Sequence, residues 1–478
     1  MQKTSFLSSL LVLCVVAGSL GGEEKARVRK LPRATLRELA ALEVPPPQAR
    51  ERRHEEPRVF GEHTRDGRRG VSTEADPPRL TTAATIAPPP IATGFPADST
   101  GILSPADASG AVSKTHVVAA SNIGITVLSR TGTRLVSATL GQFWHGAGGG
   151  ILDEVYDPRV LYDAAANRWV TVAIDDAAAV LLGVSKSGDP TGEWIRYEIP
   201  VNGCDFTRLA LTRDTILVST LIDDANASAI LSFQKAELYA GEEDLSIGNE
   251  FLDGDAVPVH APESNVEYVV SSGDSHMILF RLDTQQFASF DSGFLWEYPF
   301  DDYSPAGVTR ALSIGFGDVQ AAVLRDGWLY AVHRIGTSNH TPDGNALLWW
   351  KIDPTGARPH ELGVINSPNG TVYAYPSLAV NRKGGMVIGF CTFSATTFPS
   401  ASFVYRDPAG RVSTPRVIAT GDSRVAGTDR WGDYTTVVED PLNGHDFWIG
   451  QIRATRNSWE TWWANVKVPL PKARSARH

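Results

Sequence analysis

The stretch Arg430-Trp431-Gly432-Asp433-Tyr434-Thr435-Thr436-Val437-Val438 decides the fold class of this chain. It places an Asp directly after a Gly and follows it with β-branched residues, which favour the extended backbone of a buried strand. Similar phrases stand upstream at intervals of roughly 50 to 60 residues, the range of propeller blades. Their leading residues are Asp107, Asp157, Asp205, Asp255 and Asp318, and a variant phrase begins at Tyr375.

Each repeated unit contains four runs with strand character, and the second unit shows them most clearly. Its runs are residues 160–163, 168–174, 180–185 and 194–199, with turn residues between them. Four short antiparallel strands, repeated along the chain, are typical of a β-propeller. The sequence therefore predicts an all-β, seven-bladed β-propeller with four antiparallel strands per blade. The alternative is a β-sandwich, which has no reason to repeat one Asp-led phrase.

The last unit is one strand short, because only three runs lie between Tyr434 and Val468. An open ring would expose unpaired strand edges, which closed folds avoid. We therefore expect a segment between about Thr81 and Pro96 to add the outer strand of the last blade and close the ring.

The chain divides by composition into four parts. Residues 1–22 have a basic start, an apolar run and small residues, as a secretory signal peptide does. Residues 23–80 are rich in charge and Pro, and predict a flexible tether or pro-segment. The propeller should span 81–470, and 471–478 form a basic tail. These features predict a secreted protein, or one of the periplasm or outer envelope, and no later run is apolar enough to span a membrane.

Charge and cysteine content limit the possible partners and cross-links. The formal net charge is −10, which argues against nucleic acid as a partner. Outside the signal peptide the cysteines are Cys204 and Cys391, in separate units, so we expect two buried thiols and no disulfide. A closed propeller of this size should be stable as a monomer.

The first strand of a propeller blade lines the central channel, so the leading residues of the repeated phrases should form a ring at one mouth of that channel. The candidate ligand-binding residues are Asp107, Asp157, Arg159, Asp205, Arg208, Asp255, Asp318, Tyr375, Arg430 and Asp433. Carboxylates that lie close together can attract a cation, and Asp157, Asp205 and Asp433 are the candidate ligands of Ca²⁺. The alternative is that each Asp binds backbone N–H groups locally.

Known catalytic motifs are absent from the sequence. It contains no H-E-x-x-H zinc motif, no G-x-S-x-G nucleophile turn and no phosphate-binding loop. Residues 187–194, Ser-Gly-Asp-Pro-Thr-Gly-Glu-Trp, resemble the Asp-box, a structural hairpin turn of sialidase-type propellers. Thr191 stands where that turn usually has Gly. The resemblance supports the fold and assigns no catalytic residue.

Several phrases together resemble a group of exported bacterial propeller proteins without a settled activity. They are residues 107–112, 157–163 with 167–169, 187–192, 375–380 and 430–434 with 440–441 and 447–448. The resemblance covers roughly residues 95–468 and implies fold and export. The chain departs from the group at residues 205–208, where Tyr-Pro-Lys usually follows the Asp, and it lacks the Cys pair often seen there.

These observations predict a binding module for a glycan or protein at the cell surface. The alternative is a sialidase-like or other glycoside hydrolase acting at the channel mouth, where Arg159, Arg208 and Arg430 could meet an anionic sugar. A structural scaffold without a small ligand is a third possibility.

Overall fold

The structure is a computed structural model that describes residues 23–43 and 79–469. Short gaps interrupt the second range at 82–83, 101–104, 148–154, 177, 223–224, 226, 274–275, 293–301, 304–311, 314–316, 337–344, 357, 368–369, 424–429 and 457. The predicted signal peptide, the central part of the charged segment and the basic tail lie outside the described residues.

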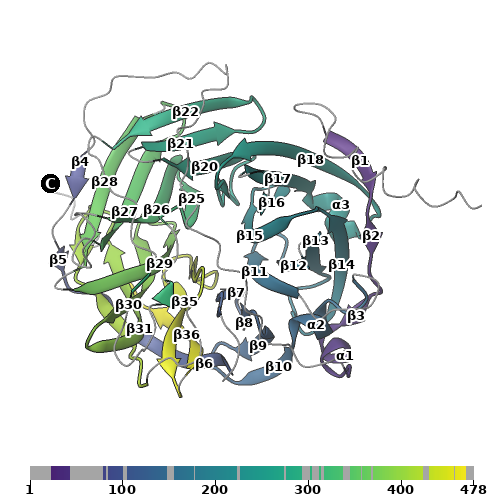
Figure 1. The fold of residues 1–478 in the computed structure, drawn as a ribbon, viewed down its shortest axis with the longest axis horizontal. Helices are drawn as coiled ribbons and strands as arrows, with labels where there is room; N and C mark the ends of the chain where they lie inside the picture. Colours follow the sequence, from purple (N-terminus) through teal and green to yellow (C-terminus); the bar gives the residue numbers. More distant parts are fainter. Residues whose placement is uncertain are drawn as a thin grey trace, which may run out of the picture.

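The predicted architecture is confirmed: seven antiparallel four-stranded blades form a propeller (Figure 1). Blade 1 runs outwards through β7 (Ser109–Val112), β8 (His116–Ser121), β9 (Gly124–Ser129) and β10 (Arg134–Ala138). Blade 2 consists of β11 (Val155–Asp163), β12 (Arg168–Asp175), β13 (Ala179–Ser185) and β14 (Glu193–Pro200). Blade 3 consists of β15 (Cys204–Leu211), β16 (Thr215–Ile222), β17 (Ala227–Gln234) and β18 (Asp244–Asp253), with α3 (Lys235–Ala240) between the last two.

The remaining blades repeat the same order. Blade 4 consists of β19 (Val257–Pro258), β20 (Tyr268–Ser272), β21 (His276–Arg281) and β22 (Gln286–Asp291). A small hairpin of β23 (Asp302–Tyr303) and β24 (Leu312–Ser313) precedes blade 5, which consists of β25 (Ala321–Arg325), β26 (Trp328–Gly336), β27 (Asn345–Asp353) and β28 (Arg358–Asn366). Blade 6 consists of β29 (Thr371–Val380), β30 (Met386–Ser394), β31 (Thr397–Arg406), β32 (Val412–Ser413) and β33 (Arg416–Ala419).

Blade 7 closes the ring with a strand from the other end of the chain. Its inner strands are β34 (Thr436–Glu439), β35 (Phe447–Thr455) and β36 (Ser458–Val466), and β6 (Ile91–Thr100) pairs with β36 as the outermost strand. The pairing is antiparallel and places Phe95 opposite Trp463. The closing strand expected between about Thr81 and Pro96 is therefore confirmed, a few residues further along the chain.

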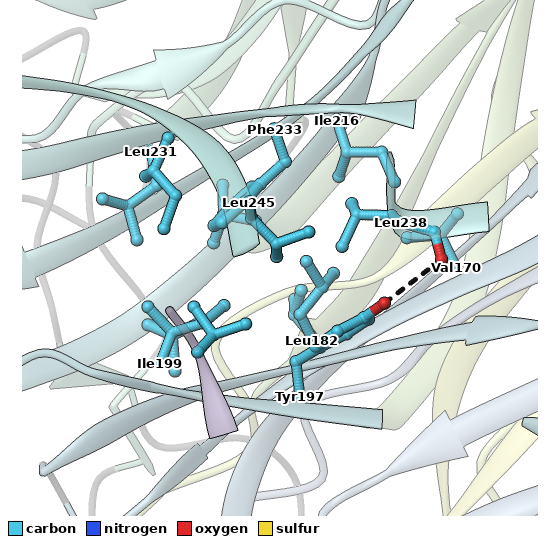
Figure 2. Close-up of a cluster of buried hydrophobic side chains, with 14 of the residues drawn as sticks. Val170, Leu182, Tyr197, Ile199, Ile216, Leu231, Phe233, Leu238 and Leu245 are labelled. Carbon is cyan, nitrogen blue, oxygen red and sulfur yellow. Dashed lines mark hydrogen bonds between the residues drawn. The ribbon is translucent and has the colours of Figure 1, made fainter. Parts of the chain in front are cut away.

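Blades pack through continuous apolar strands. Val170, Leu182 and Tyr197 of blade 2 belong to one buried cluster with Ile216 and Phe233 of blade 3 (Figure 2). Burial on both sheet faces explains why these strands are almost wholly apolar instead of alternating. The Tyr197 hydroxyl is satisfied inside the cluster, because it donates to the Leu238 carbonyl at 3.3 Å.

The described parts of the chain before β6 lie along outer strands of several blades. Strand β1 (Glu23–Arg27) pairs with β18, while β2 (Arg29–Lys30) and β3 (Ala34–Thr35) pair with β14. Helix α1 (Leu36–Ala40) lies against α2 (Leu140–Phe143) and β10 of blade 1. Strands β4 (Arg79–Thr81) and β5 (Ala84–Ile86) then pair in parallel with β28 and β32. We call residues 23–43 the belt.

The belt differs from the flexible tether that its charged composition predicts. Leu31, Leu36 and Leu39 are buried, and α1 begins with a capping box in which Thr35 and Glu38 bond each other's backbone N–H. Its charges have partners on the blades: Arg29 pairs with Glu198 at 2.7 Å, and Lys30 with Glu243 at 3.3 Å. The belt therefore covers the outer edges of β14 and β18, which would otherwise be unpaired.

Cys204 on β15 and Cys391 on β30 are both buried thiols, and they form no disulfide with each other. Within the described residues, no helix has the length and hydropathy needed to cross a membrane.

Candidate functional site

The innermost strands share a kinked start. Asp107, Asp157, Phe206 and Tyr375 have φ values of 48°, 53°, 54° and 52°, in the left-handed region. In β11, β15 and β29 the strand pairing shifts register at this residue, as a β-bulge does. Few residues other than Gly adopt this conformation, and bulky aromatic residues seldom do. The surrounding structure must therefore hold the kink in place. We call the central part of the ring, where these strands begin, the hub.

Hydrogen bonds between neighbouring blades identify equivalent positions around the hub. The Thr207 hydroxyl donates to the carbonyl of Asp157 at 2.6 Å, and the Thr435 hydroxyl donates to the carbonyl of Tyr375 at 2.7 Å. Thr207 directly follows Phe206 and Thr435 directly follows Tyr434, so the equivalent bonds make Tyr434 the positional counterpart of Phe206, although Tyr434 lacks the left-handed φ. The phrases led by Asp205 and Asp433 are thus displaced by one residue from the predicted alignment.

A second bond repeats with the same spacing. The N–H of Val160 donates to Ser109 at 3.1 Å, and the N–H of Val437 donates to Ser377 at 3.0 Å. Each Ser lies two residues after its kink residue, on the preceding blade. These side chain–backbone bonds join blade 1 to blade 2 and blade 6 to blade 7.

Three of the predicted carboxylates lie together. Asp107, Asp157 and Asp433 each offer an oxygen atom within 4.8 Å of the others, and all three are buried. Asp107 accepts from the N–H of Asp433 at 2.7 Å and from Asn122 Nδ2 at 2.5 Å. Asp157 accepts from the N–H of Phe206 at 3.1 Å. Asp107 and Asp157 therefore bind backbone N–H groups of neighbouring blades.

The carboxylate group differs from the predicted metal ligands in one member. Asp107 takes the place of Asp205, which is half-buried and lies outside the group. Oxygen atoms of this kind suit Ca²⁺. The observed hydrogen bonds of Asp107 and Asp157 differ from the local ones of the alternative, because they join neighbouring blades. Asp433 also pairs with Arg430 at 2.5 Å.

Side chains of non-adjacent blades meet at the axis of the ring. The guanidinium carbon of Arg159 lies 3.2 Å from the ring centroid of Tyr434, and the Tyr434 hydroxyl donates to the Pro158 carbonyl at 3.1 Å. The rings of Tyr434 and Phe206 meet edge to face at 5.9 Å. Blades 7, 2 and 3 can meet in this way only near the axis. We call Arg159, Phe206, Arg208 and Tyr434 the axial cluster.

The two arginines of the axial cluster have different surroundings. Arg208 lies 4.4 Å above the Phe206 ring, is 4% exposed and forms an ion pair with Asp255. Arg159 keeps partial exposure, and its Nε donates to the Thr207 carbonyl at 2.9 Å. Arg159 is therefore the member of the cluster that solvent reaches.

Burial controls ionisation in the axial cluster. It raises the pKa of Tyr434 well above its ordinary value, and the Asp157 charge adds to this effect, so Tyr434 is a neutral phenol. Burial also lowers the pKa of Arg159, with a further lowering from the charge of Arg208. Tyr375 is buried as well, and burial followed by the Asp433 charge raises its pKa well above the ordinary value.

The remaining predicted site residues lie apart from the axial cluster or play structural roles. Asp205 accepts the Thr220 hydroxyl on its backbone carbonyl at 2.7 Å, and Asp318 is buried before β25. Asp255 is committed to Arg208, and Arg430 to Asp433.

The Asp-box-like turn lies between β13 and β14, the third and fourth strands of blade 2. Asp189 accepts from the N–H of Thr191 at 2.9 Å, and Trp194 Nε1 donates to the Pro190 carbonyl at 2.9 Å. These bonds stabilise the turn locally. Its residues belong to the outer strands and contribute nothing to the hub.

Sequence reasoning missed Phe206, Tyr434 and Asn122. The first two could have been found by aligning units three and seven on their shared aromatic–Thr pair, at residues 206–207 and 434–435. Asn122 follows β8 and bridges Asp107 to the N–H of Asp157 at 2.9 Å. No repeat in the sequence marks it.

Comparison with known proteins adds no activity. No protein-family model matches the chain, and no curated protein matches its sequence. Among solved structures, the dihydro-heme d1 dehydrogenase NirN in complex with DHE aligns with TM-score 0.34 and 10% identity, over 65% of this chain and 57% of that one. The α-L-arabinofuranosidase Arb93A from Fusarium graminearum aligns with TM-score 0.35 and 10% identity, over 65% and 92%. The AfRom2 CNH domain aligns with TM-score 0.40 and 8% identity, over 79% and 100%.

Proposed function

We propose that the chain is an exported binding module that holds an extracellular or envelope glycan at the hub of its propeller. The observation that carries the proposal is Arg159, a partly exposed guanidinium fixed on the Tyr434 ring at 3.2 Å. A cation held by a rigid surround can bind a ligand with little further loss of conformational freedom. A protein ligand is the other partner compatible with a module of this kind.

Glycan-array binding tests this proposal. The array should contain neutral and acidic oligosaccharides, and we expect saturable binding to a subset of them. A parallel assay for released reducing sugar or sialic acid tests the alternative of a glycoside hydrolase. Absence of binding to every glycan would contradict the proposed function.

Nothing in the described hub favours hydrolysis over binding. A glycosidase needs two carboxyl groups that reach the substrate. Asp107 and Asp157 are 0% exposed and Asp433 is 4% exposed, and their oxygens already bond N–H groups or Arg430. In this structure these three carboxylates are therefore engaged with the protein itself.

A further inference from the structure

Most hydrogen-bond donors of the Arg159 guanidinium are unused among the described residues. An arginine has five N–H donors, and here the one on Nε bonds the Thr207 carbonyl. Within the described part of the chain, the two η nitrogens form no hydrogen bond, and no carboxylate forms an ion pair with Arg159. A largely enclosed cation without an ion-pair partner is costly, and an anion from outside would offset that cost.

The position of this guanidinium is fixed before any ligand arrives. One face stacks on Tyr434, Nε is held by blade 3, and Phe206 lies 5.7 Å from the guanidinium carbon. The fork of η nitrogens matches the two oxygens of a carboxylate, which a flexible lysine would not do as well. This fixed fork suits a planar anion with two oxygens.

Arg208 adds a second positive charge to the same cluster. Its Nη1 is buried and has no hydrogen-bond partner among the described residues. Both guanidinium groups lie over the Phe206 ring, at 4.4 Å for Arg208 and 5.7 Å for Arg159. Asp255 forms an ion pair with Arg208, and Arg208 in turn lies on the Phe206 ring beside Arg159.

The negative charges of two nearby carboxylates would repel an anion bound to Arg159. Asp107 and Asp157 lie near enough to Arg159 to favour its charged form. Both already accept N–H groups, from Asp433, Asn122 and Phe206. Their repulsion should limit the affinity and penalise any anion that cannot bond both η nitrogens at once.

We propose that the hub binds acidic sugars, with the carboxylate of a uronic acid held by the two η nitrogens of Arg159. This inference rests on the proposed glycan-binding function and names the ligand class of the same site. Arg208 acts as a positioning residue, because it holds the Phe206 ring beside Arg159. An acidic peptide would present the same carboxylate chemistry and is treated as an outcome of the test.

The test compares two ligands that share one sugar chain, one with free carboxylates and one with its carboxyl groups methylated. A tetramer of galacturonic acid and the methyl ester of the same tetramer are titrated calorimetrically into the intact protein. We expect the acid to bind at least tenfold more tightly than the ester, because a hydrogen bond to a charged group is lost in the ester. Polyglutamate of similar length is titrated alongside.

Three variants complete the experiment, each checked by its melting curve. Arg159→Gln should lose the preference for the acid, and Arg159→Lys should keep part of it because the charge remains. Arg281→Gln is the matched control, since Arg281 pairs with Asp283 at 2.6 Å on blade 4, away from the hub.

Each outcome decides the inference. Equal affinity for acid and ester overturns it, although the proposed function stands if neutral glycans bind. No binding of any glycan overturns both. Binding of polyglutamate but not of the uronate overturns the assignment of a sugar as the ligand. If the Arg159 variants fail to fold, the comparison of acid with ester on the native protein still decides the inference.

Discussion

At the scale of single residues, Asp98 is a buried carboxylate in an unusual position. It lies on the closing strand β6, is 4% exposed, and accepts the Thr126 hydroxyl on Oδ1 at 2.5 Å, while its Oδ2 has no hydrogen-bond partner among the described residues. Burial raises its pKa from 3.8 to about 6. The charged form is therefore disfavoured in the folded state, and the closing strand carries a cost at neutral pH.

We predict that Asp98→Asn raises the stability of the protein at pH 7.5. The folded pKa lies above the unfolded one, so the stability that Asp98 contributes is present below pH 4 and lost as the pH rises through 6. The loss is on the order of 3 kcal/mol above pH 6. Melting curves at pH 7.5 and pH 5.0 should show a gain for the variant that is larger at pH 7.5.

Asp283→Asn is the control for this prediction. Asp283 is exposed, and its pKa is lowered by hydrogen bonding to Arg281. Removing its charge should give no gain at pH 7.5. An Asp98→Asn variant that melts lower than the native protein at both pH values would contradict the assignment.

The interblade hydroxyl bonds support a second prediction at this scale. Thr207 is 0% exposed and Thr435 is 5% exposed, and both donate to the carbonyl of the preceding kink residue. Thr207→Val and Thr435→Val should each lower the free energy of unfolding by about 1–2 kcal/mol, because a buried carbonyl loses a donor. Thr→Ser at the same positions should cost less. Valine variants as stable as the serine variants would show that the hydroxyls do not join the blades.

At the scale of elements, the belt and the closing strand cover different edges. The belt pairs with blades 2 and 3, whereas β6 supplies a complete strand of blade 7. Removal of the belt exposes edges of blades that remain four-stranded. Removal of β6 leaves blade 7 with three strands and opens the ring.

We therefore predict graded effects of N-terminal truncation on the melting temperature. A chain beginning after residue 43 should melt lower than the native chain, because the buried side chains of Leu31, Leu36 and Leu39 are lost. A chain beginning at Ala97 should lose far more, since most of β6 is gone. Equal melting temperatures for the native chain and the one beginning at Ala97 would contradict closure by β6.

The sequence predicted these elements unequally. The strands of blade 2 and the missing strand of blade 7 were evident, because apolar runs and turn residues are local signals. The belt was not evident from the sequence, because its strands are short and highly charged. They are stabilised by the outer strands of blades that lie far away in the sequence. Arg29 meets Glu198 across 169 residues. Composition alone could not distinguish such a segment from a tether.

At the scale of the whole molecule, the hub was predicted in part. The shared position of Asp107, Asp157 and Asp433 was expected from the repeat, and the structure brings them together. The displacement of units three and seven by one residue was not expected, because the spacing of the Asp-led phrases does not show which residue of each phrase takes the equivalent position. In unit three a bulge in β15 accompanies the displacement. Contacts such as Arg159 on Tyr434 depend on ring closure, which no local pattern specifies.

Blade 4 stands out from the other blades of the ring. Its innermost strand β19 has 2 residues, and within the described part of the chain no belt or N-terminal strand pairs with its outer strand β22. Blade 2, in contrast, has strands of 7 to 9 residues and is paired with β2 and β3. Local opening should therefore begin at blade 4.

Hydrogen exchange can check this uneven stability. We predict that the amides of β20 to β22 exchange faster than those of β12 to β14 under native conditions. Peptides spanning β8 and β9 of blade 1, whose outer edge is covered by α1, serve as an internal comparison. Uniform protection across all blades would contradict a weak point at blade 4.

The pairing of β6 with β36 has a consequence for the order of events during synthesis. β6 ends at Thr100 and β36 begins at Ser458, so about 360 residues must leave the ribosome between the two halves of this contact. At ~5–20 residues per second, that takes about 20 to 70 s. For all of that time the nascent chain carries a strand without its partner, and this strand includes Phe95 and Asp98, which are buried in the folded protein.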